Sequence, residues 1–259
     1  RVDRRQRQMC IRDRYYILLL SALIGMMLMS SSLELLVIFI GLEIMSISSY
    51  ILVGMKRKVP ESGEAALKYL LLGAFSTGFL LYGISLLYGA TGSTYLPDML
   101  QQLRLGAVKT PLALAGIALL TIGLSFKVAI VPFHMWTPDV YSGAPTPVTG
   151  FMSAAAKAAG FAIMIRILLV GIPLEQVEGW ETILGWLAML TMTIGNLVAL
   201  QQQNVKRMLA YSSIAHAGYM MVAVAVGTTA AIGSVLFYAL AYAVVSTGAF
   251  GILTIRNRG

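Results

Sequence analysis

The sequence predicts an all-α protein, a polytopic bundle of transmembrane helices in which one helix is broken at a proline. Of its 259 residues, 58% are hydrophobic and only 12% are charged, whereas a soluble domain normally carries about 25% charged residues. Apolar runs of about 20 residues, the length that crosses a bilayer, recur from Tyr15 onward. Pro132 interrupts the fourth of these runs, close to Lys127. We therefore expect an integral membrane protein.

The apolar runs define about eight spans, each long enough to cross a lipid bilayer. They lie at residues 15–31, 33–55, 64–89, 111–131, 146–169, 181–202, 207–227 and 230–255. Connections are short, except for 90–110 and the Pro-rich stretch between the fourth and fifth spans. The prediction is one transmembrane domain over residues 15–255, without an inserted soluble domain, followed by a truncated loop at 256–259.

The first fourteen residues, RVDRRQRQMCIRDR, differ from the rest of the chain. They hold six arginines and two aspartates, which supply half of the formal net charge of +8. They contain no initiator methionine, no apolar run and no helical period, so we expect a non-native sequencing tail and exclude it from fold reasoning. A native basic arm is the alternative.

Lys and Arg residues in the short loops predict the orientation of the chain, because such loops are enriched in them on the cytoplasmic side. One set of loops holds Lys56, Arg57, Lys58, Lys206, Arg207, Arg256 and Arg258. The opposite set holds Arg104, Lys109 and an acidic turn with Glu175, Glu178 and Glu181. Alternating spans place all of the first set on one side, which we expect to face the cytoplasm.

Several chemistries are excluded by composition. The charges outside the tail are scattered over loops, which argues against nucleic-acid binding. The only cysteine, Cys10, lies in the tail, so neither disulfides nor cysteine-based metal sites are expected. The two histidines are far apart and have no carboxylate at ligand spacing, so no metal site is predicted. No Gly-rich loop follows a strand to hold a nucleotide.

Glu43 lies about ten residues into the second span, at a depth where a charge must be paired or neutralised, because burial there costs several kcal/mol. It is therefore either a structural glutamate bonded to a neighbouring helix or a carboxylate that takes up and releases protons. Glu34 is nine residues earlier, on the opposite face and nearer the helix end. We expect Glu34 at the interface.

Lys127 precedes Pro132, which cannot donate to the carbonyl of Val128 and clashes with it, so a helix break is predicted there. Irregular backbone at membrane depth occurs where it is buried in protein or lines a wet cavity. Lys127 is thus a site candidate, with snorkelling to the interface as the alternative. Lys157 lies in mid-span between small residues that allow close helix packing. Because burial disfavours the charged form of lysine, Lys157 suits a proton relay.

His216, Tyr211 and His134 are possible relay residues, and Ser212, Ser213 and Tyr219 lie near His216 in sequence. A hydrogen-bonded packing role is the alternative for this histidine. His134 and Asp139 fall in the Pro-rich connection and are candidates for a channel mouth. Lys68 and Arg166 lie close to span ends, where snorkelling is expected.

Four segments carry a family resemblance. KVAIVPFHMWTPDVYSGAPTPVTGFMSAAAKAAGFA, GLEIMSISSYILVG, EAALKYLLLGAFSTG and QQNVKRMLAYSSIAHAGYM are similar to the antiporter-like, proton-conducting membrane subunits of respiratory complex I. The resemblance covers nearly everything from residue 15, and the Pro-rich block with its flanking lysines is highly specific. It implies part of an inverted-repeat fold whose remaining helices, one with another central lysine, lie beyond Gly259.

The resemblance also implies roles. Glu43 matches the family's membrane glutamate, Lys127 the broken-helix lysine that pairs with it, and Lys157 the next lysine of the path. His216 extends the path. The chain would then be a non-redox subunit of a proton-translocating NADH:quinone reductase in the bacterial inner membrane. It would hold no cofactor, and partner membrane subunits would accompany redox subunits carrying NADH, FMN, iron–sulfur clusters and quinone.

Two other readings remain open. A subunit of a multi-component cation/proton antiporter, or of a membrane-bound hydrogenase, would share the same motifs. A purely structural membrane subunit would use its buried charges only to fix helix packing.

Overall fold

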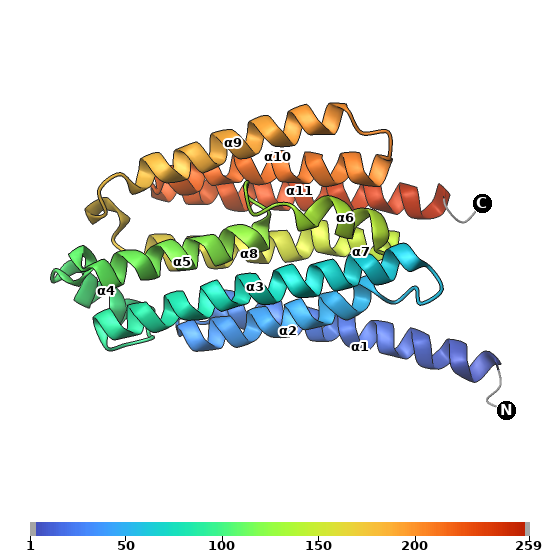
Figure 1. The fold of residues 1–259 in the computed structure, drawn as a ribbon, viewed down its shortest axis with the longest axis horizontal. Helices are drawn as coiled ribbons and strands as arrows, with labels where there is room; N and C mark the ends of the chain where they lie inside the picture. Colours follow the sequence, from blue (N-terminus) through green and yellow to red (C-terminus); the bar gives the residue numbers. More distant parts are fainter. Residues whose placement is uncertain (1–3, 257–259) are drawn as a thin grey trace.

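The computed structural model describes residues 4–256, and over this range it consists of helices joined by loops and turns, with one isolated β-bridge between Glu34 and Tyr95. Eight segments are long and apolar enough to cross a membrane, which confirms the predicted all-α class and number of spans. The long helices run along one common direction in Figure 1.

Seven spans belong to single helices: α1 (Arg4–Ser31), α2 (Leu35–Val53), α3 (Pro60–Thr91), α5 (Pro111–Val128), α9 (Trp180–Leu200), α10 (Val205–Val226) and α11 (Thr229–Arg256). The remaining span, Thr146–Val170, is composite. It consists of α7 (Thr146–Phe151), a π-helical segment (Met152–Ala156), α8 (Lys157–Ile165) and a second π-helical segment (Arg166–Val170). The shorter elements are α4 (Leu96–Arg104), α6 (Trp136–Gly143) and 3₁₀ turns at Ala107–Lys109 and Leu174–Gln176.

The N-terminal segment is helical from Arg4. Residues 4–14, which lie outside the predicted transmembrane domain, continue the first spanning helix in α1. Residues 1–3 of the predicted tail and residues 257–259 of the predicted loop lie outside the described residues. A helical conformation is compatible with both a native and a non-native tail.

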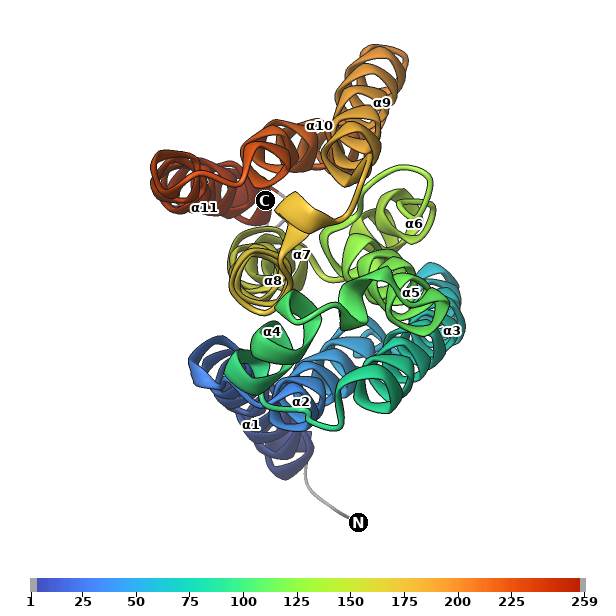
Figure 2. The ribbon, with the colours of Figure 1, turned by 90° about the vertical axis from the view of Figure 1, so that its left-hand side faces the viewer.

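The helices form three groups. Figure 2 looks along them and shows α7 and α8 in the middle, with α1, α2 and α3 on one side and α9, α10 and α11 on the other. The central span contacts α1, α5 and α11. Close crossing of α1 and α2 depends on Gly25 and Gly41, because a Cβ on Gly25 would lie 2.5 Å from the carbonyl oxygen of Gly41. Small residues allow such backbone approach in membranes.

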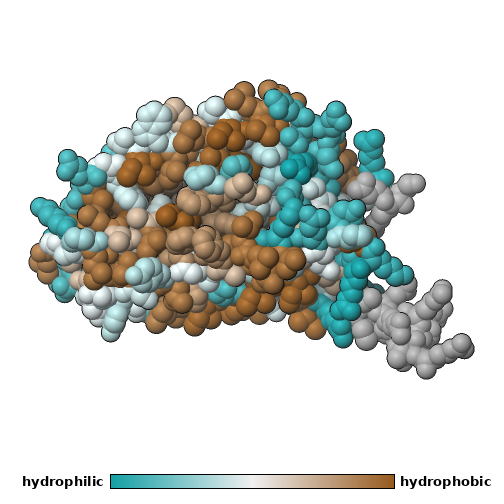
Figure 3. Space-filling model, in the orientation of Figure 1, coloured by the Kyte–Doolittle hydropathy of each residue, from teal (hydrophilic) through white to brown (hydrophobic). Residues whose placement is uncertain are grey.

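The two ends of the bundle differ in charge. One end, called the basic end below, holds the 54–59 loop, the 201–204 turn and the end of α11, with Lys56, Arg57, Lys58, Lys206, Arg207 and Arg256. The other end holds α4 and the acidic turn. Figure 3 shows hydrophilic residues gathered at the ends and hydrophobic residues between them. Phe75, Phe237 and Leu240 are among the exposed apolar side chains, as expected for a surface that faces lipid.

The predicted helix break is present, at the residue whose carbonyl Pro132 cannot bond. Helix α5 ends at Val128 and Ala129 adopts the left-handed conformation, with φ of 62°. The amides of Ala129 and Ile130 bond the carbonyls of Phe126 and Ser125, which closes the last turn. The Val131–Pro132 peptide is cis, and the chain resumes helical structure in α6 at Trp136. α5 and α6 are thus the two halves of one broken element.

Candidate functional site

Two predicted charges meet inside the bundle. Lys127 lies in the last turn of α5, and its Nζ is 3.9 Å from Oε1 of Glu43 on α2. The side chain of Lys127 is 4% exposed and that of Glu43 is 24% exposed. The ammonium therefore points into protein, and the snorkelling alternative for Lys127 does not describe this structure.

Two hydroxyl groups complete this pair. Lys127 donates a hydrogen bond of 3.0 Å to Oγ of Ser46, which lies one turn after Glu43 on α2. Thr77 on α3 donates 2.8 Å to the same Oε1 of Glu43 that faces the lysine. Neither hydroxyl can neutralise a charge, but both lower the cost of keeping it out of water. We call Glu43, Ser46, Thr77 and Lys127 the glutamate–lysine centre.

Lys157 forms a second centre. It is 4% exposed and lies where the π-helical segment passes into α8. Its ammonium donates to both the carbonyl oxygen and the hydroxyl of Ser213 on α10. It also lies 5.8 Å from the ring centroid of Tyr242 on α11, within the range of a cation–π contact. A π-bulge beside a functional residue is a recurrent association.

His216 lies one turn beyond Ser213 on α10 and is surrounded by tyrosines. Its Nδ1 is 2.6 Å from the hydroxyl of Tyr238, and its ring is 4.8 Å from that of Tyr242. Tyr219 contacts the same ring edge-on at 5.7 Å. Because Tyr242 contacts both Lys157 and His216, these two candidate relay residues belong to one neighbourhood.

The two centres are neighbours without touching. Val128, next to Lys127, packs on Gly160, one turn after Lys157, where an added Cβ would lie 2.7 Å from Cγ1 of Val128. Within residues 12–256 no hydrogen bond or ion pair joins the two lysines. The hydroxyls of Ser125 and Thr137, at the break, are buried and have no partner in the described part of the chain. Such groups are normally satisfied by internal water.

The other sequence candidates are dispersed. Tyr211 is five positions before His216, which turns it well away from that ring, and it packs against the hydrophobic cluster that includes Ala210 and Ile214. His134 is half-buried in the break, where burial lowers the pKa of its imidazole. Glu34 is at the N-cap of α2, at a helix end as expected. Arg166 donates to the carbonyls of Ser31 and Ser32.

Asp139 lies near the basic end and is paired twice. Its Oδ2 is 2.9 Å from Nζ of Lys68 on α3, and its Oδ1 is 2.9 Å from NH1 of Arg207 on α10. Burial by itself would raise the pKa of Asp139, but the hydrogen bonds and charges of Lys68 and Arg207 outweigh it and hold the pKa below its ordinary value of 3.8. The carboxylate is thus ionised at neutral pH.

Sequence reasoning missed the contributions of Ser46, Thr77 and the tyrosines of α11. Ser46 carried a usable signal, because it lies three residues after Glu43 and hence on the same helix face. Thr77, Tyr238 and Tyr242 carried none, since each reaches its partner from a separate helix.

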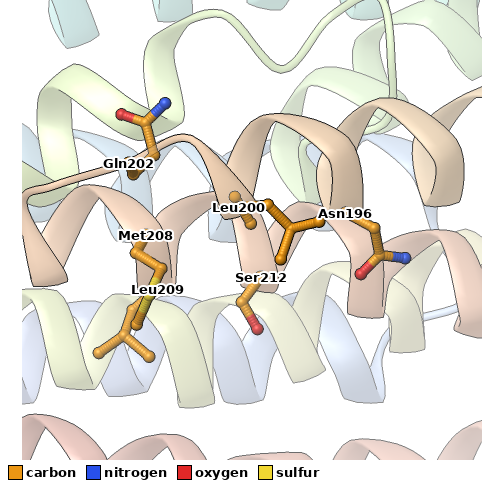
Figure 4. Close-up of a pocket in the computed structure, with 7 residues that line it drawn as sticks. Asn196, Leu200, Gln202, Met208, Leu209 and Ser212 are labelled. Carbon is orange, nitrogen blue, oxygen red and sulfur yellow. The ribbon is translucent and has the colours of Figure 1, made fainter.

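A cavity of about 420 Å³ opens between α9 and α10, away from both centres. Figure 4 shows Asn196, Leu200, Gln202, Met208, Leu209 and Ser212 around it. None of its lining residues is charged, so it offers no acid–base chemistry. The amides of Asn196 and Gln202 are bonded to carbonyls of their own helix.

The bundle combines a broken helix with two buried lysines whose ammonium groups bond hydroxyl groups. Buried charges beside irregular backbone are typical of membrane proteins that transport ions or protons. The comparison with known families agrees with this class. The family described as NADH:quinone oxidoreductase/Mrp antiporter, TM, matches residues 32–258, and the chain belongs to this family.

Three known proteins illustrate the similarity. NADH-quinone oxidoreductase subunit N of Trichlorobacter lovleyi is 51% identical over 250 residues, covering 96% of this chain and 51% of the relative. Respiratory complex I from Thermus thermophilus contains a chain that is 43% identical with a TM-score of 0.79, covering 93% of this chain and 51% of that one. An archaeal membrane-bound sulfane sulfur reductase contains one that is 34% identical with a TM-score of 0.83, covering 91% and 48%.

The chain spans about half the length of the curated relatives it matches. The matched half includes both lysine centres, since the family match begins before Glu43 and extends past His216.

Proposed function

We propose that this chain is part of an antiporter-like subunit of NADH:quinone oxidoreductase, of the kind named subunit N in its relatives, and that it translocates protons. The glutamate–lysine centre carries the proposal. A lysine only 4% exposed, whose one carboxylate partner lies 3.9 Å away on a separate helix, can gain or lose its proton as that partner changes position or charge.

The proposed path has two lysine steps. While Glu43 is ionised it favours the ammonium form of Lys127. When the pair separates, Lys127 loses this support and releases a proton through ordered water or the hydroxyls at the break to the neutral amine of Lys157. The proton then leaves Lys157 towards His216, past Ser213 and Tyr242. Each step moves one proton between two basic nitrogens, so charge is conserved along the path.

Electron transfer would belong to partner subunits. We propose that NADH, FMN, iron–sulfur clusters and quinone are bound there, and that this non-redox chain contributes as part of the proton-translocating enzyme. The basic end would face the cytoplasm, in the inner membrane of a bacterium, and other membrane subunits of the complex would cover part of the exposed apolar surface.

The test is Lys127→Met in the full-length subunit, assembled in its complex and reconstituted in sealed vesicles. Methionine keeps the length of the side chain and removes its protonation. We expect fewer protons translocated per electron. Lys58→Met, at an exposed loop lysine, is the matched control and should behave as wild type. An unchanged proton-to-electron ratio in Lys127→Met would refute the proposed role.

A cation/proton antiporter subunit is the second candidate, favoured by the family description, which includes Mrp antiporters. It predicts Na⁺-dependent proton movement in vesicles without NADH oxidation. The identity of 51% to a subunit N supports the first candidate. Neighbouring genes for redox subunits would separate the two.

A further inference from the structure

Cations from two other helices fasten the short helix α6, at Asp139 in its first turn and at its C-terminal end. Asp139 binds Lys68 of α3 through one carboxylate oxygen and Arg207 of α10 through the other, both at 2.9 Å. Lys206 of α10 adds bonds of 2.8 and 2.6 Å to the carbonyls of Ser142 and Ala144, at the end of α6. These contacts hold α6 against α3 and α10.

The inner end of α6 carries a buried aromatic layer. Trp136 is 5% exposed and stacks on Tyr69 of α3, with ring centroids 4.6 Å apart and an interplanar angle of 12°. Tyr69 in turn meets Tyr50 of α2 edge-on at 4.6 Å. The indole of Trp136 donates 2.9 Å to the carbonyl of Phe126 on α5. We call Tyr50, Tyr69 and Trp136 the aromatic layer.

The aromatic layer lies between the ion pairs and the glutamate–lysine centre. On α2, which runs towards the basic end, Tyr50 follows Ser46 by one turn, about 6 Å at a rise of 1.5 Å per residue. On α3, Tyr69 directly follows Lys68, whose ammonium reaches outward to Glu64, one turn nearer the basic end, at 2.8 Å. On α6, Trp136 precedes Asp139. All three helices give the same order.

A polar pocket of about 310 Å³ lies at the basic end, beside Lys68 and Asp139. Its lining includes Glu61, Glu64, Lys68, Asp139, Ser142 and Asn204. Water can therefore reach Asp139 from the basic end. Access to Lys127, which lies behind Trp136 and Tyr69, would require α6 to move.

We propose that Asp139 is the latch of a gate, in which its ion pairs with Lys68 and Arg207 keep α6 and the aromatic layer closed between the polar pocket and Lys127. The inference rests on the proposed function and adds a control of proton entry from the basic end. Lys68 suits such a latch because Glu64 already shares its ammonium at 2.8 Å, so release from Asp139 does not leave the cation unpaired. Asp139 is a positioning residue in this scheme and takes no part in proton transfer.

The experiment measures access to the glutamate–lysine centre directly. In the full-length subunit, assembled in its complex and with other cysteines removed, Ser46→Cys places a thiol next to Lys127. Sealed vesicles with the basic end outward are treated with a small cationic methanethiosulfonate reagent, without substrate. We expect Asp139→Asn to raise the labelling rate at least about tenfold.

Two controls separate gating from loosening. Glu64→Gln removes the other partner of Lys68 and leaves the latch intact, so it should label at the parent rate. Ser76→Cys reports a buried site two turns, about 10 Å, beyond Tyr69 along α3, where Ser76 bonds the carbonyl of Gly123, and its labelling should stay constant in Asp139→Asn. Equal acceleration at both reporters would mean general unfolding and would overturn the gate, as would no acceleration at Ser46→Cys.

If Asp139→Asn does not assemble, Lys68→Met takes its place, because it keeps the Arg207 pair. An acceleration of about threefold or more at Ser46→Cys supports the gate, and an unchanged rate overturns it. The labelling needs no proton translocation, so its result is independent of the Lys127→Met test of the proposed function.

Discussion

Glu43 and Lys127 are 84 residues apart in the chain, yet their charged atoms lie 3.9 Å from one another. They share one environment lined by hydroxyl groups, in which Ser46 binds the ammonium and Thr77 binds the carboxylate. The separation is longer than a direct hydrogen bond. At this distance each charge still stabilises the other, and the two side chains can separate without breaking a direct hydrogen bond.

Glu43→Gln should slow proton translocation by at least about tenfold, since the ammonium of Lys127 would lose its anionic partner in a site that excludes water. The measurement is the initial rate of acidification in vesicles during NADH oxidation. Thr77→Val is the matched control, because it removes one hydrogen bond to Glu43 and leaves both charges in place. If Thr77→Val slows translocation as much as Glu43→Gln, the loss of rate comes from disturbed helix packing and not from the missing charge.

The spans and the buried charges could be predicted because each depends on local composition. A run of about 20 apolar residues has few other uses, and a lone Glu43 or Lys157 within one is conspicuous by its cost. The pairing of Glu43 with Lys127 followed only from the family resemblance, because no spacing rule connects residues on separate helices.

Other features depended on the backbone in three dimensions. Pro132 predicted the break after Val128, but nothing in the sequence predicted that Ala129 turns left-handed and caps the end of α5. The fifth span read as one regular helix, whereas two π-helical segments, Met152–Ala156 and Arg166–Val170, interrupt it. The run of small residues around Ala154 has no signature that distinguishes α from π geometry.

Tyr238→Phe tests whether the tyrosines around His216 contribute to proton movement. It removes only the hydroxyl that lies 2.6 Å from Nδ1 of His216, so the stability cost should be about 1 kcal/mol. We expect translocation to slow by about threefold at unchanged assembly. Tyr219→Phe is the control, because that hydroxyl bonds Asn196 and not the histidine. Equal rates in the two variants would leave His216 a packing residue.

Acid should weaken the fastening of α6. The pKa of Asp139 is held below 3.8 by Lys68 and Arg207, against the effect of burial, so its ion pairs stabilise the folded state fully above that value. This contribution is lost as the pH falls from 3.8 through the lower folded-state pKa. Glu61, Glu64 and Lys206 face the same region and contribute their own charges.

The melting temperature of the purified complex, measured between pH 8 and pH 3, checks this. The difference between wild type and Asp139→Asn should be constant down to about pH 5 and shrink below pH 4. A difference that already disappears near neutral pH would mean that Asp139 is not held ionised by its two cations.

A substitution at Gly73 tests the packing of Tyr50, which belongs to the aromatic layer. A Cβ built at this position of α3 would lie 2.1 Å from the hydroxyl oxygen of Tyr50, a clash that neither backbone can relieve easily. Gly73→Ala should therefore destabilise the protein by about 1–3 kcal/mol, the usual cost of overpacking. Tyr50→Phe removes the clashing oxygen but leaves the ring carbon Cζ 2.7 Å from the added Cβ, so the double variant should regain only part of the lost melting temperature. Because the Tyr50 hydroxyl has no hydrogen-bond partner in the described part of the chain, Tyr50→Phe alone should cost little. If the double variant melts no higher than Gly73→Ala, the contact with Tyr50 is not the reason that glycine is required at this position of α3.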